Sequence, residues 1–291
     1  MQNAEEHAWR QLVSSEVVAT VIAVGDVEMF AVSAGDGATP VVFVNGLGEA
    51  TPTWAPVLPN LASTCRVVAY DRPGMGASPP ATGARSLERM GSELNGLLAE
   101  LGEAPAVLVG HSLGGLIAIE AYRRRPEQVA GLVLIDPADP KMIRRRGLVA
   151  IQRVALWLPR ALAALGLWGR IARSAARKEA AAAAGPEAQG ALASALLENL
   201  LSAAARKATS DELSGMVRSV RGGVDATSAI PIEVPLTVLS ATSGGTGKKS
   251  RAEWTDGHRL LVGASPAGHH REVDGGHYLH REQPSVVATS S

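Results

Sequence analysis

The chain has one cysteine, no excess of either charge, and no long uncharged apolar run. A lone cysteine, Cys65, excludes an intramolecular disulfide and fits a reducing compartment. Basic and acidic residues number 28 each, which gives no indication of a nucleic-acid binder. No stretch reaches the roughly 18 consecutive apolar residues of a membrane-spanning helix, and the acidic start does not resemble a secretory signal. We therefore expect a cytoplasmic protein.

Short apolar runs alternate with helical patterns over the first half of the chain, whose 291 residues suffice for one large α/β core, with or without a lid. Such uncharged runs suit strands that are buried on both faces of a parallel sheet. They are predicted at residues 41–44, 67–70, 106–109 and 132–135, with helices at 87–101 and 113–125 and an N-terminal hairpin of strands 17–24 and 28–33 turning at Gly25-Asp26. This alternation predicts a mostly parallel, right-handed wound sheet.

The alternation stops after Asp136 and resumes near Leu236. Between them lies an Ala- and Arg-rich stretch of helical runs. After this stretch the sequence predicts a strand at 236–240, a helix at 251–262, a strand at 269–273 and a final helix from about Gln283. We expect residues 1–136 and 229–291 to form the core, and residues 137–228 to form an all-helical cap over the carboxyl edge of the sheet, where open α/β sheets bind ligands.

The predicted cap begins with an uneven charge. Residues 137–180 contain ten basic and two acidic side chains, a local excess of eight positive charges. Arg153, Trp157 and Arg160 share one helical face by their spacing. One interpretation is a lid that weakly contacts a membrane surface or anionic amphiphiles. We favour the simpler one, an amphipathic cap with its arginines in solvent.

Residues 110–115 carry the most specific motif of the chain. Ser112 stands between Gly110 and Gly114 at a strand-to-helix turn, the G-x-S-x-G arrangement of a nucleophile elbow. Side chains at the two glycine positions would collide with neighbouring backbone. The amide of Leu113 opens the next helix and forms a natural anion site. The motif predicts Ser112 as a nucleophile.

A serine nucleophile needs a base, and seven histidines are available. His277 lies in a glycine-rich loop, residues 274–278, after the last short strand and before the last helix. Such a loop returns to the carboxyl edge of the sheet beside Ser112, so we predict His277 as the base. His280 is the alternative on the same stretch, and His111 is expected to be structural.

Together these pieces resemble the α/β-hydrolase superfamily, in its cap-bearing serine esterase and lipase-like branch. The resemblance implies an α/β-hydrolase fold with a mostly parallel, eight-stranded type of sheet, and a catalytic triad in the chain order Ser, acid, His. It covers roughly residues 40–138 and 230–288, and it rests on 45–48 with Trp54, the Asp-Arg-Pro-Gly run at 71–78, the elbow, 134–137, 276–278 and Gln283-Pro284.

The acid is the least obvious member of that triad. Many relatives carry it after the strand that corresponds to 236–240, but the loop 241–247 contains no carboxylate. A minority place it one strand earlier, where this chain has Asp136. The resemblance therefore implies that Asp136 orients His277 and stabilises the imidazolium. Asp139 and Asp256 are the alternatives, and Asp136 would then be only a turn residue.

The same resemblance implies an oxyanion hole built from the backbone amides of Leu47 and Leu113. Gly46 and Gly48 let the loop approach a substrate closely. Asn45 departs from the family, which usually has a histidine before the glycine, and this raises the question of how the loop is supported. Trp54 and the loop 71–78 are expected to be structural, and the loop 71–78 is expected to brace the oxyanion loop.

The expected function is cofactor-independent and metal-independent hydrolysis of a small carboxylic ester through an acyl-enzyme. Trp157, Trp168 and many leucines in the predicted cap suggest an apolar or amphipathic acyl group. Lactonase, thioesterase and carbon–carbon bond hydrolase stay open, as does a non-catalytic binder of a small ligand. Epoxide hydrolase and haloalkane dehalogenase are less favoured, because such relatives carry aspartate at the position of Ser112. The oligomeric state is not predicted.

Overall fold

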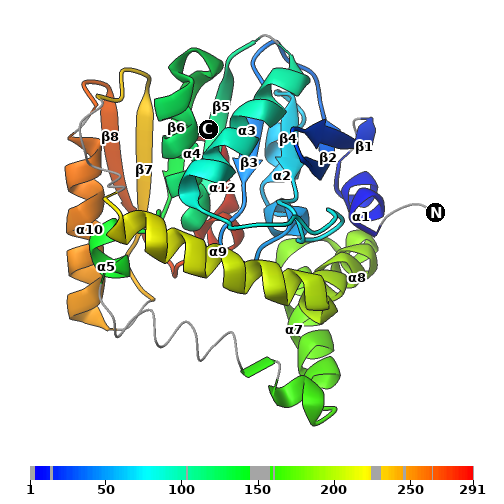
Figure 1. Cartoon of the computed structure of the whole chain (residues 1–291). Helices are drawn as coiled ribbons and strands as arrows, with labels where there is room; N and C mark the ends of the chain where they lie inside the picture. The colour runs from blue at the N-terminus through cyan, green and yellow to red at the C-terminus, as the bar shows by residue number, and fades with distance from the viewer. Residues whose placement is uncertain are drawn as a thin grey trace.

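A computed structural model describes residues 4–13, 16–102, 104–144, 158–159, 161–223, 231–244, 247–263 and 265–290. Its centre is one eight-stranded sheet in the order β1-β2-β4-β3-β5-β6-β7-β8 (Figure 1). Pairings β1–β2 and β2–β4 are antiparallel and the other five are parallel. The strands are β1 (Val17–Val24), β2 (Val27–Ala34), β3 (Val41–Val44), β4 (Val67–Tyr70), β5 (Ala106–His111), β6 (Val129–Ile135), β7 (Leu236–Ala241) and β8 (Gly268–Val273). The predicted mostly parallel sheet is confirmed.

Each face of the sheet packs on its own hydrophobic core, and successive residues of β3 alternate between them. Val42 and Val44 join side chains of α3 and α4, whereas Val41 and Phe43 join side chains of α1, α2 and α12. This two-sided burial explains why the parallel strands read as continuous apolar runs. The helices of these layers are α1 (Ala4–Leu12), α2 (Leu58–Leu61), α3 (Leu87–Leu101), α4 (Leu113–Arg124) and α12 (Pro284–Ala288).

Other helices lie at the edges and turns of the sheet. Helix α10 (Lys248–Val262) packs beside β7 and β8 and begins three residues before the predicted Arg251. The final helix is preceded by the short α11 (Leu279–Glu282), which sequence reasoning did not separate. Two 3₁₀ turns, η1 (Thr51–Trp54) and η2 (Pro126–Gln128), complete the core elements.

Four described helices lie between β6 and β7: α5 (Pro140–Ile143), α7 (Trp168–Ala183), α8 (Pro186–Leu201) and α9 (Ala203–Arg221). Helix α9 runs along one end of the sheet, and α7 extends away from the body of the molecule (Figure 1). The exposed basic side chains of α7 are Arg170, Arg173, Arg177 and Lys178. The helical face predicted for Arg153, Trp157 and Arg160 lies outside the described residues.

No helix within the described ranges combines the length and apolar character needed to cross a bilayer.

Candidate active site

Ser112 occupies a strained corner between β5 and α4. Its backbone has φ 51° and ψ −115°, a conformation uncommon for any residue with a side chain. The amide of Ser112 donates to the carbonyl of Ile135 at 3.0 Å, which anchors the corner to the neighbouring strand. A Cβ at Gly114 would strike the carbonyl oxygen of Val44, and one at Gly110 would lie 2.6 Å from the carbonyl oxygen of Gly114. The two glycines are therefore needed for the turn to close.

Two hydrogen bonds join the three residues predicted as nucleophile, base and acid. The Nε2 atom of His277 lies 3.1 Å from Ser112 Oγ, and its Nδ1 atom lies 2.6 Å from Oδ2 of Asp136. Because a carboxylate only accepts, Nδ1 carries the proton, and Nε2 of the neutral ring accepts from the serine hydroxyl. The three side chains come from the ends of β5 and β6 and from the loop after β8, segments that the parallel sheet brings to one edge.

Asp136 is fully buried and, like Ser112, has a positive φ, 41°. Its oxygens accept two hydrogen bonds of 2.9 Å from Arg251 on α10 and one of 3.1 Å from the amide of Ala241. Burial alone would raise the pKa of Asp136. The hydrogen bonds and charges of His277 and Arg251 outweigh burial and lower the pKa below its usual value. Sequence reasoning missed Arg251, which is 115 residues from Asp136 and carries no motif.

His277 is shielded from solvent, with a quarter of its side chain exposed. Burial lowers its pKa, the hydrogen bond to Asp136 opposes this shift, and the nearby charge of His111 adds to it. The net pKa lies below the usual value. A neutral ring at physiological pH has the lone pair that a general base requires.

The alternatives considered from the sequence have other contacts. His280 is fully buried, and its Nε2 lies 2.9 Å from the hydroxyl of Thr53. The side chain of Asp139 accepts from the amide of Lys141 at 2.6 Å and caps α5. Asp256 lies on α10, where it is 65% exposed and pairs with Arg259 at 2.7 Å.

The loop after β3, residues 45–49, lies next to this corner and contains the predicted amide of Leu47. Gly48 has φ 75°, and the amide of Glu49 donates to the carbonyl of Gly46 at 3.3 Å, which closes the turn around Leu47. The other predicted donor, the amide of Leu113, is the first of α4 and has no acceptor within its helix.

Asn45 and Trp54 support the start of this loop. The side-chain amide of Asn45 donates to the carbonyl of Tyr70 at 2.9 Å, and the indole N–H of Trp54 donates to Asn45 Oδ1 at 2.6 Å. Asparagine therefore anchors the loop to β4, at the position where the sequence departs from the family pattern.

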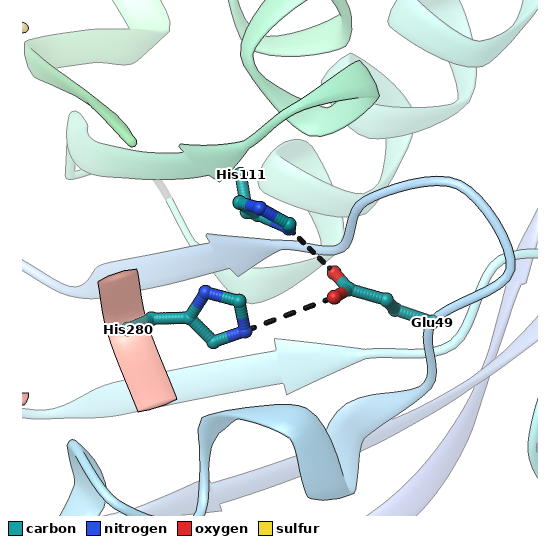
Figure 2. Close-up of side chains that lie close together, drawn as sticks. All are labelled: Glu49, His111 and His280. Carbon is teal, nitrogen blue, oxygen red and sulfur yellow. Dashed lines mark hydrogen bonds and ion pairs between the residues drawn. The ribbon is translucent and has the colours of Figure 1, made fainter. Parts of the chain in front are cut away.

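A second buried carboxylate, that of Glu49 at the end of this loop, belongs to a cluster that sequence reasoning did not find. Glu49 is 2.9 Å from His111 Nδ1 and 3.7 Å from His280 Nε2 (Figure 2). It also lies 3.1 Å from a guanidinium nitrogen of Arg281. Its Oε2 also accepts from the amide of Gly46 at 2.6 Å. Burial would raise the pKa of Glu49, but the charge and hydrogen bond of His111 and the charge of Arg281 hold it well below its usual range.

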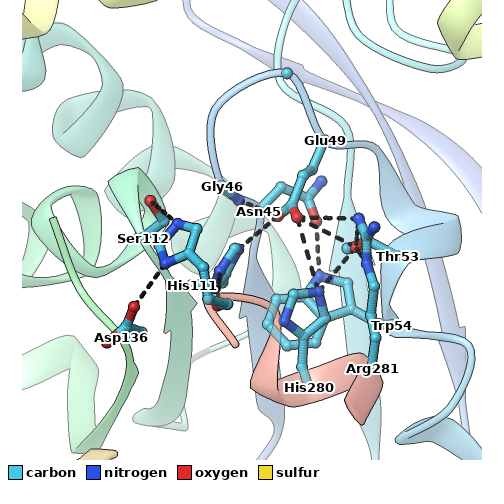
Figure 3. A network of polar contacts seen from close by, with 12 residues as sticks. Asn45, Gly46, Glu49, Thr53, Trp54, His111, Ser112, Asp136, His280 and Arg281 are labelled. Carbon is cyan, nitrogen blue, oxygen red and sulfur yellow. Dashed lines mark hydrogen bonds and ion pairs between the residues drawn. The ribbon is translucent and has the colours of Figure 1, made fainter. Parts of the chain in front are cut away.

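The side chains of Glu49, His111 and His280 also lie close enough to be considered as metal ligands, with their donor atoms within 4.8 Å of one another. However, the other nitrogen of His111, Nε2, lies 2.9 Å from the carbonyl oxygen of His277. Both ring nitrogens of His111 therefore lie against protein oxygens, so these contacts leave neither nitrogen free to bind a cation. Together with Arg281, this makes the cluster a charge network rather than a good cation site. Figure 3 shows it beside Ser112 and Asp136.

Comparisons with known proteins agree with this architecture. The model of a family described as "Alpha/beta hydrolase family" matches residues 41–290. A candidate carbamate hydrolase, RutD, of Azorhizobium caulinodans is 31% identical over 112 residues, which cover 38% of this chain and 42% of that protein. A pimeloyl-[acyl-carrier protein] methyl ester esterase of Sodalis glossinidius is 37% identical over 109 residues, covering 38% and 40%.

The chain spans less than half the length of these curated relatives. Among solved structures, an epoxide hydrolase, CorEH, without ligand has a TM-score of 0.68 and 16% identity, and the match covers 94% of this chain and 96% of that one. At this identity the similarity is one of fold.

Proposed function

The chain belongs to the alpha/beta hydrolase family, and on that premise we propose that it is a serine hydrolase that cleaves carboxylic esters through an acyl-enzyme. The observation that carries the proposal is the continuous hydrogen-bond chain from Ser112 Oγ through His277 to Asp136. In this proposal Ser112 is the nucleophile, His277 the general base and Asp136 the acid that orients the imidazole.

Acylation begins when Ser112 Oγ attacks the acyl carbon and His277 Nε2 takes the hydroxyl proton. The resulting oxyanion accepts hydrogen bonds from the amides of Leu47 and Leu113, and each such donor is worth on the order of 10²–10³ in rate. Collapse of the tetrahedral intermediate expels the alcohol, which takes the proton from His277. Water then attacks the acyl-enzyme with His277 again as the base and releases the acid.

The ester bond is proposed over the other bonds for two reasons. The proposed site combines a nucleophile, a base and two backbone amides for one oxyanion, which are the groups that acyl transfer requires. In addition, one curated relative is named an esterase of a methyl ester and another a candidate hydrolase of a carbamate, both acyl compounds. We propose residues 137–228 as a cap that shapes the acyl site, with an apolar or amphipathic acyl group as the substrate class.

Turnover of p-nitrophenyl esters from acetate to palmitate tests the proposal, with Ser112→Ala alongside. We expect hydrolysis with an initial burst in the wild type, and at least a 10³-fold loss with no burst in the variant. Equal activity in both proteins would refute Ser112 as the nucleophile.

A fluorophosphonate probe separates the remaining alternatives. Labelling of Ser112 without turnover of any ester in the series would point to a lactone, a thioester or a carbon–carbon bond as the substrate. Absence of both labelling and turnover would favour a binder of a small ligand.

A further inference from the structure

Arg72 holds the peptide bond between Gly46 and Leu47 by its carbonyl oxygen. One terminal nitrogen of Arg72 donates to the carbonyl of Gly46 at 2.7 Å and the other to the carbonyl of Asn45 at 2.5 Å. The guanidinium is nearly completely buried, at 2% exposure. Two consecutive carbonyls of the loop are therefore fixed by one rigid, planar group.

Fixing a carbonyl also fixes the amide that shares its peptide plane. In a trans peptide, the C=O of one residue and the N–H of the next point in opposite directions, and the described residues contain no cis peptide bond. Because the carbonyl of Gly46 points at Arg72, the N–H of Leu47 points away from Arg72. This N–H is the donor that the proposed mechanism uses for the oxyanion.

Arg72 is itself oriented by a residue far away in the sequence, Glu212 on α9. The carboxylate of Glu212 accepts from Nε of Arg72 at 2.6 Å and from a terminal nitrogen at 2.8 Å, and its side chain has no solvent exposure. This two-point contact sets the plane of the guanidinium, and therefore the direction of the donors that reach Asn45 and Gly46.

A second side chain ties the same loop to the helices between β6 and β7. Asn199, near the end of α8, donates to the carbonyl of Gly48 at 3.0 Å and accepts from the amide of Gly76 at 3.0 Å. The carbonyls of Asn45, Gly46 and Gly48 are thus bound either by α8 directly or by Arg72, whose orientation is set from α9.

We propose that Glu212 is a positioning residue of the reaction, acting through Arg72 to aim the Leu47 amide at the oxyanion. The inference rests on the proposed function, since it gives the Leu47 amide its catalytic role. It assigns α9 a fixed place in the active site: the helix holds the oxyanion loop in its working conformation in addition to covering the site.

The test compares Glu212→Gln with Glu93→Gln, a matched control. Glu93 on α3 also forms a two-point ion pair with a buried arginine, Arg85, at 2.6 and 2.7 Å, and its side chain is 8% exposed. It accepts a further hydrogen bond from Nε of Arg89 at 2.9 Å. Both variants remove a buried carboxylate charge that is paired with arginine, but of the two only Glu212 pairs with an arginine that hydrogen-bonds the carbonyls of Asn45 and Gly46. Three readouts are compared: steady-state kinetics on the best p-nitrophenyl ester, the dissociation constant of a trifluoromethyl ketone, and hydrogen exchange of the amides of residues 46–49. The ketone forms a bond to Ser112 Oγ and places an oxyanion in the hole.

For Glu212→Gln we expect kcat to fall by about 10- to 100-fold with little change in KM, since the donor is misaligned rather than removed. The ketone should bind more weakly by a similar factor, and the loop amides should exchange faster. Glu93→Gln should lose thermal stability without these changes. Wild-type kcat, ketone affinity and loop exchange in a folded Glu212→Gln would overturn the inference.

Two further comparisons separate failure of this inference from failure of folding or of the proposed ester substrate. If Glu212→Gln does not fold, Glu212→Asp retains the charge but shortens the reach to Arg72, and it should lower kcat and ketone affinity in the same direction; unchanged values would overturn the inference. If the wild type itself hydrolyses no ester, the proposed ester substrate fails. The ketone and hydrogen-exchange readouts still decide the role of Glu212.

Discussion

Two carboxylate–histidine pairs lie side by side in this protein, with their imidazole rings 4.7 Å apart: Asp136 with His277, and Glu49 with His111. In each pair the carboxylate is buried and accepts a hydrogen bond from Nδ1, at 2.6 Å in the first pair and 2.9 Å in the second. The pairs differ in the partner of Nε2. His277 faces the hydroxyl of Ser112, whereas His111 faces a backbone carbonyl.

This difference distinguishes the proposed base, His277, from a histidine whose contacts hold a loop. A hydroxyl can donate, so Nε2 of His277 keeps its lone pair and can receive a proton. A carbonyl only accepts, so Nε2 of His111 is placed to donate to it and not to act as a base. A histidine–carboxylate pair is therefore not sufficient evidence for a catalytic histidine; the partner of the second nitrogen decides. His111 instead holds the loop of His277 through that loop's carbonyl.

Breaking the pair of Asp136 and His277 should give the largest loss of kcat. Asp136→Asn leaves an amide that can stabilise the wrong imidazole tautomer, and kcat should fall by about 10⁴-fold. The measurement is kcat on an activated ester, with the melting temperature recorded to confirm that the variant is folded. Near-normal activity would remove Asp136 from the mechanism and return Asp139 and Asp256 to consideration.

Breaking the second pair should act mainly on stability. Glu49→Gln leaves His111 and Arg281 without their shared buried anion, a loss of about 3–5 kcal/mol in the free energy of unfolding. Urea unfolding measures this loss, and kcat of the folded fraction should fall far less than in Asp136→Asn. If Glu49→Gln lost as much kcat as Asp136→Asn while keeping normal stability, the Glu49–His111 pair would not have the mainly structural role assigned to it.

The smallest effect is expected from changing the surroundings of the first pair. Because the pKa of His277 is below the ordinary 6.5 and the neutral ring is the active form, kcat/KM should fall only as the pH drops below about that value. Arg251→Gln removes a cation from Asp136, which then stabilises the imidazolium more strongly, so the acid limb should move to higher pH.

Arg259→Gln is the control, since Arg259 lies on the same helix but pairs with Asp256 and Glu272 at the surface. A pH profile of Arg251→Gln that stays in place or moves to lower pH would contradict the assignment of Arg251.

The parts of the fold and site that were predictable from sequence are those whose signal is local. The elbow places Ser112 within six residues of sequence, the glycine-rich loop marks His277, and apolar runs define the strands of the sheet. Asp136 is predicted as the acid because the loop 241–247, the usual position for it, contains no carboxylate. Its hydrogen bond to His277 spans 141 residues and has no periodicity that a sequence can display.

The side chains that surround the site were not predictable for the same reason. Arg72 contacts Glu212 across 140 residues, and His111 contacts Glu49 across 62. Ion pairs of this kind depend on the packing of helices against the sheet edge, and neither spacing nor composition encodes the partner. The run at 71–78 suggested a brace for the oxyanion loop, but not that a glutamate of α9 would complete it.

The contact of Arg72 with Glu212 also bears on how the gene can change. Lysine in place of Arg72 would lack the planar fork that reaches two carbonyls and a carboxylate, and loss of Glu212 alone would leave a buried cation unpaired. Single substitutions at either position are therefore costly intermediates. The codons of residues 72 and 212 lie far apart in the gene, but we expect them to change together. Relatives that have replaced the glutamate should therefore also have replaced the arginine.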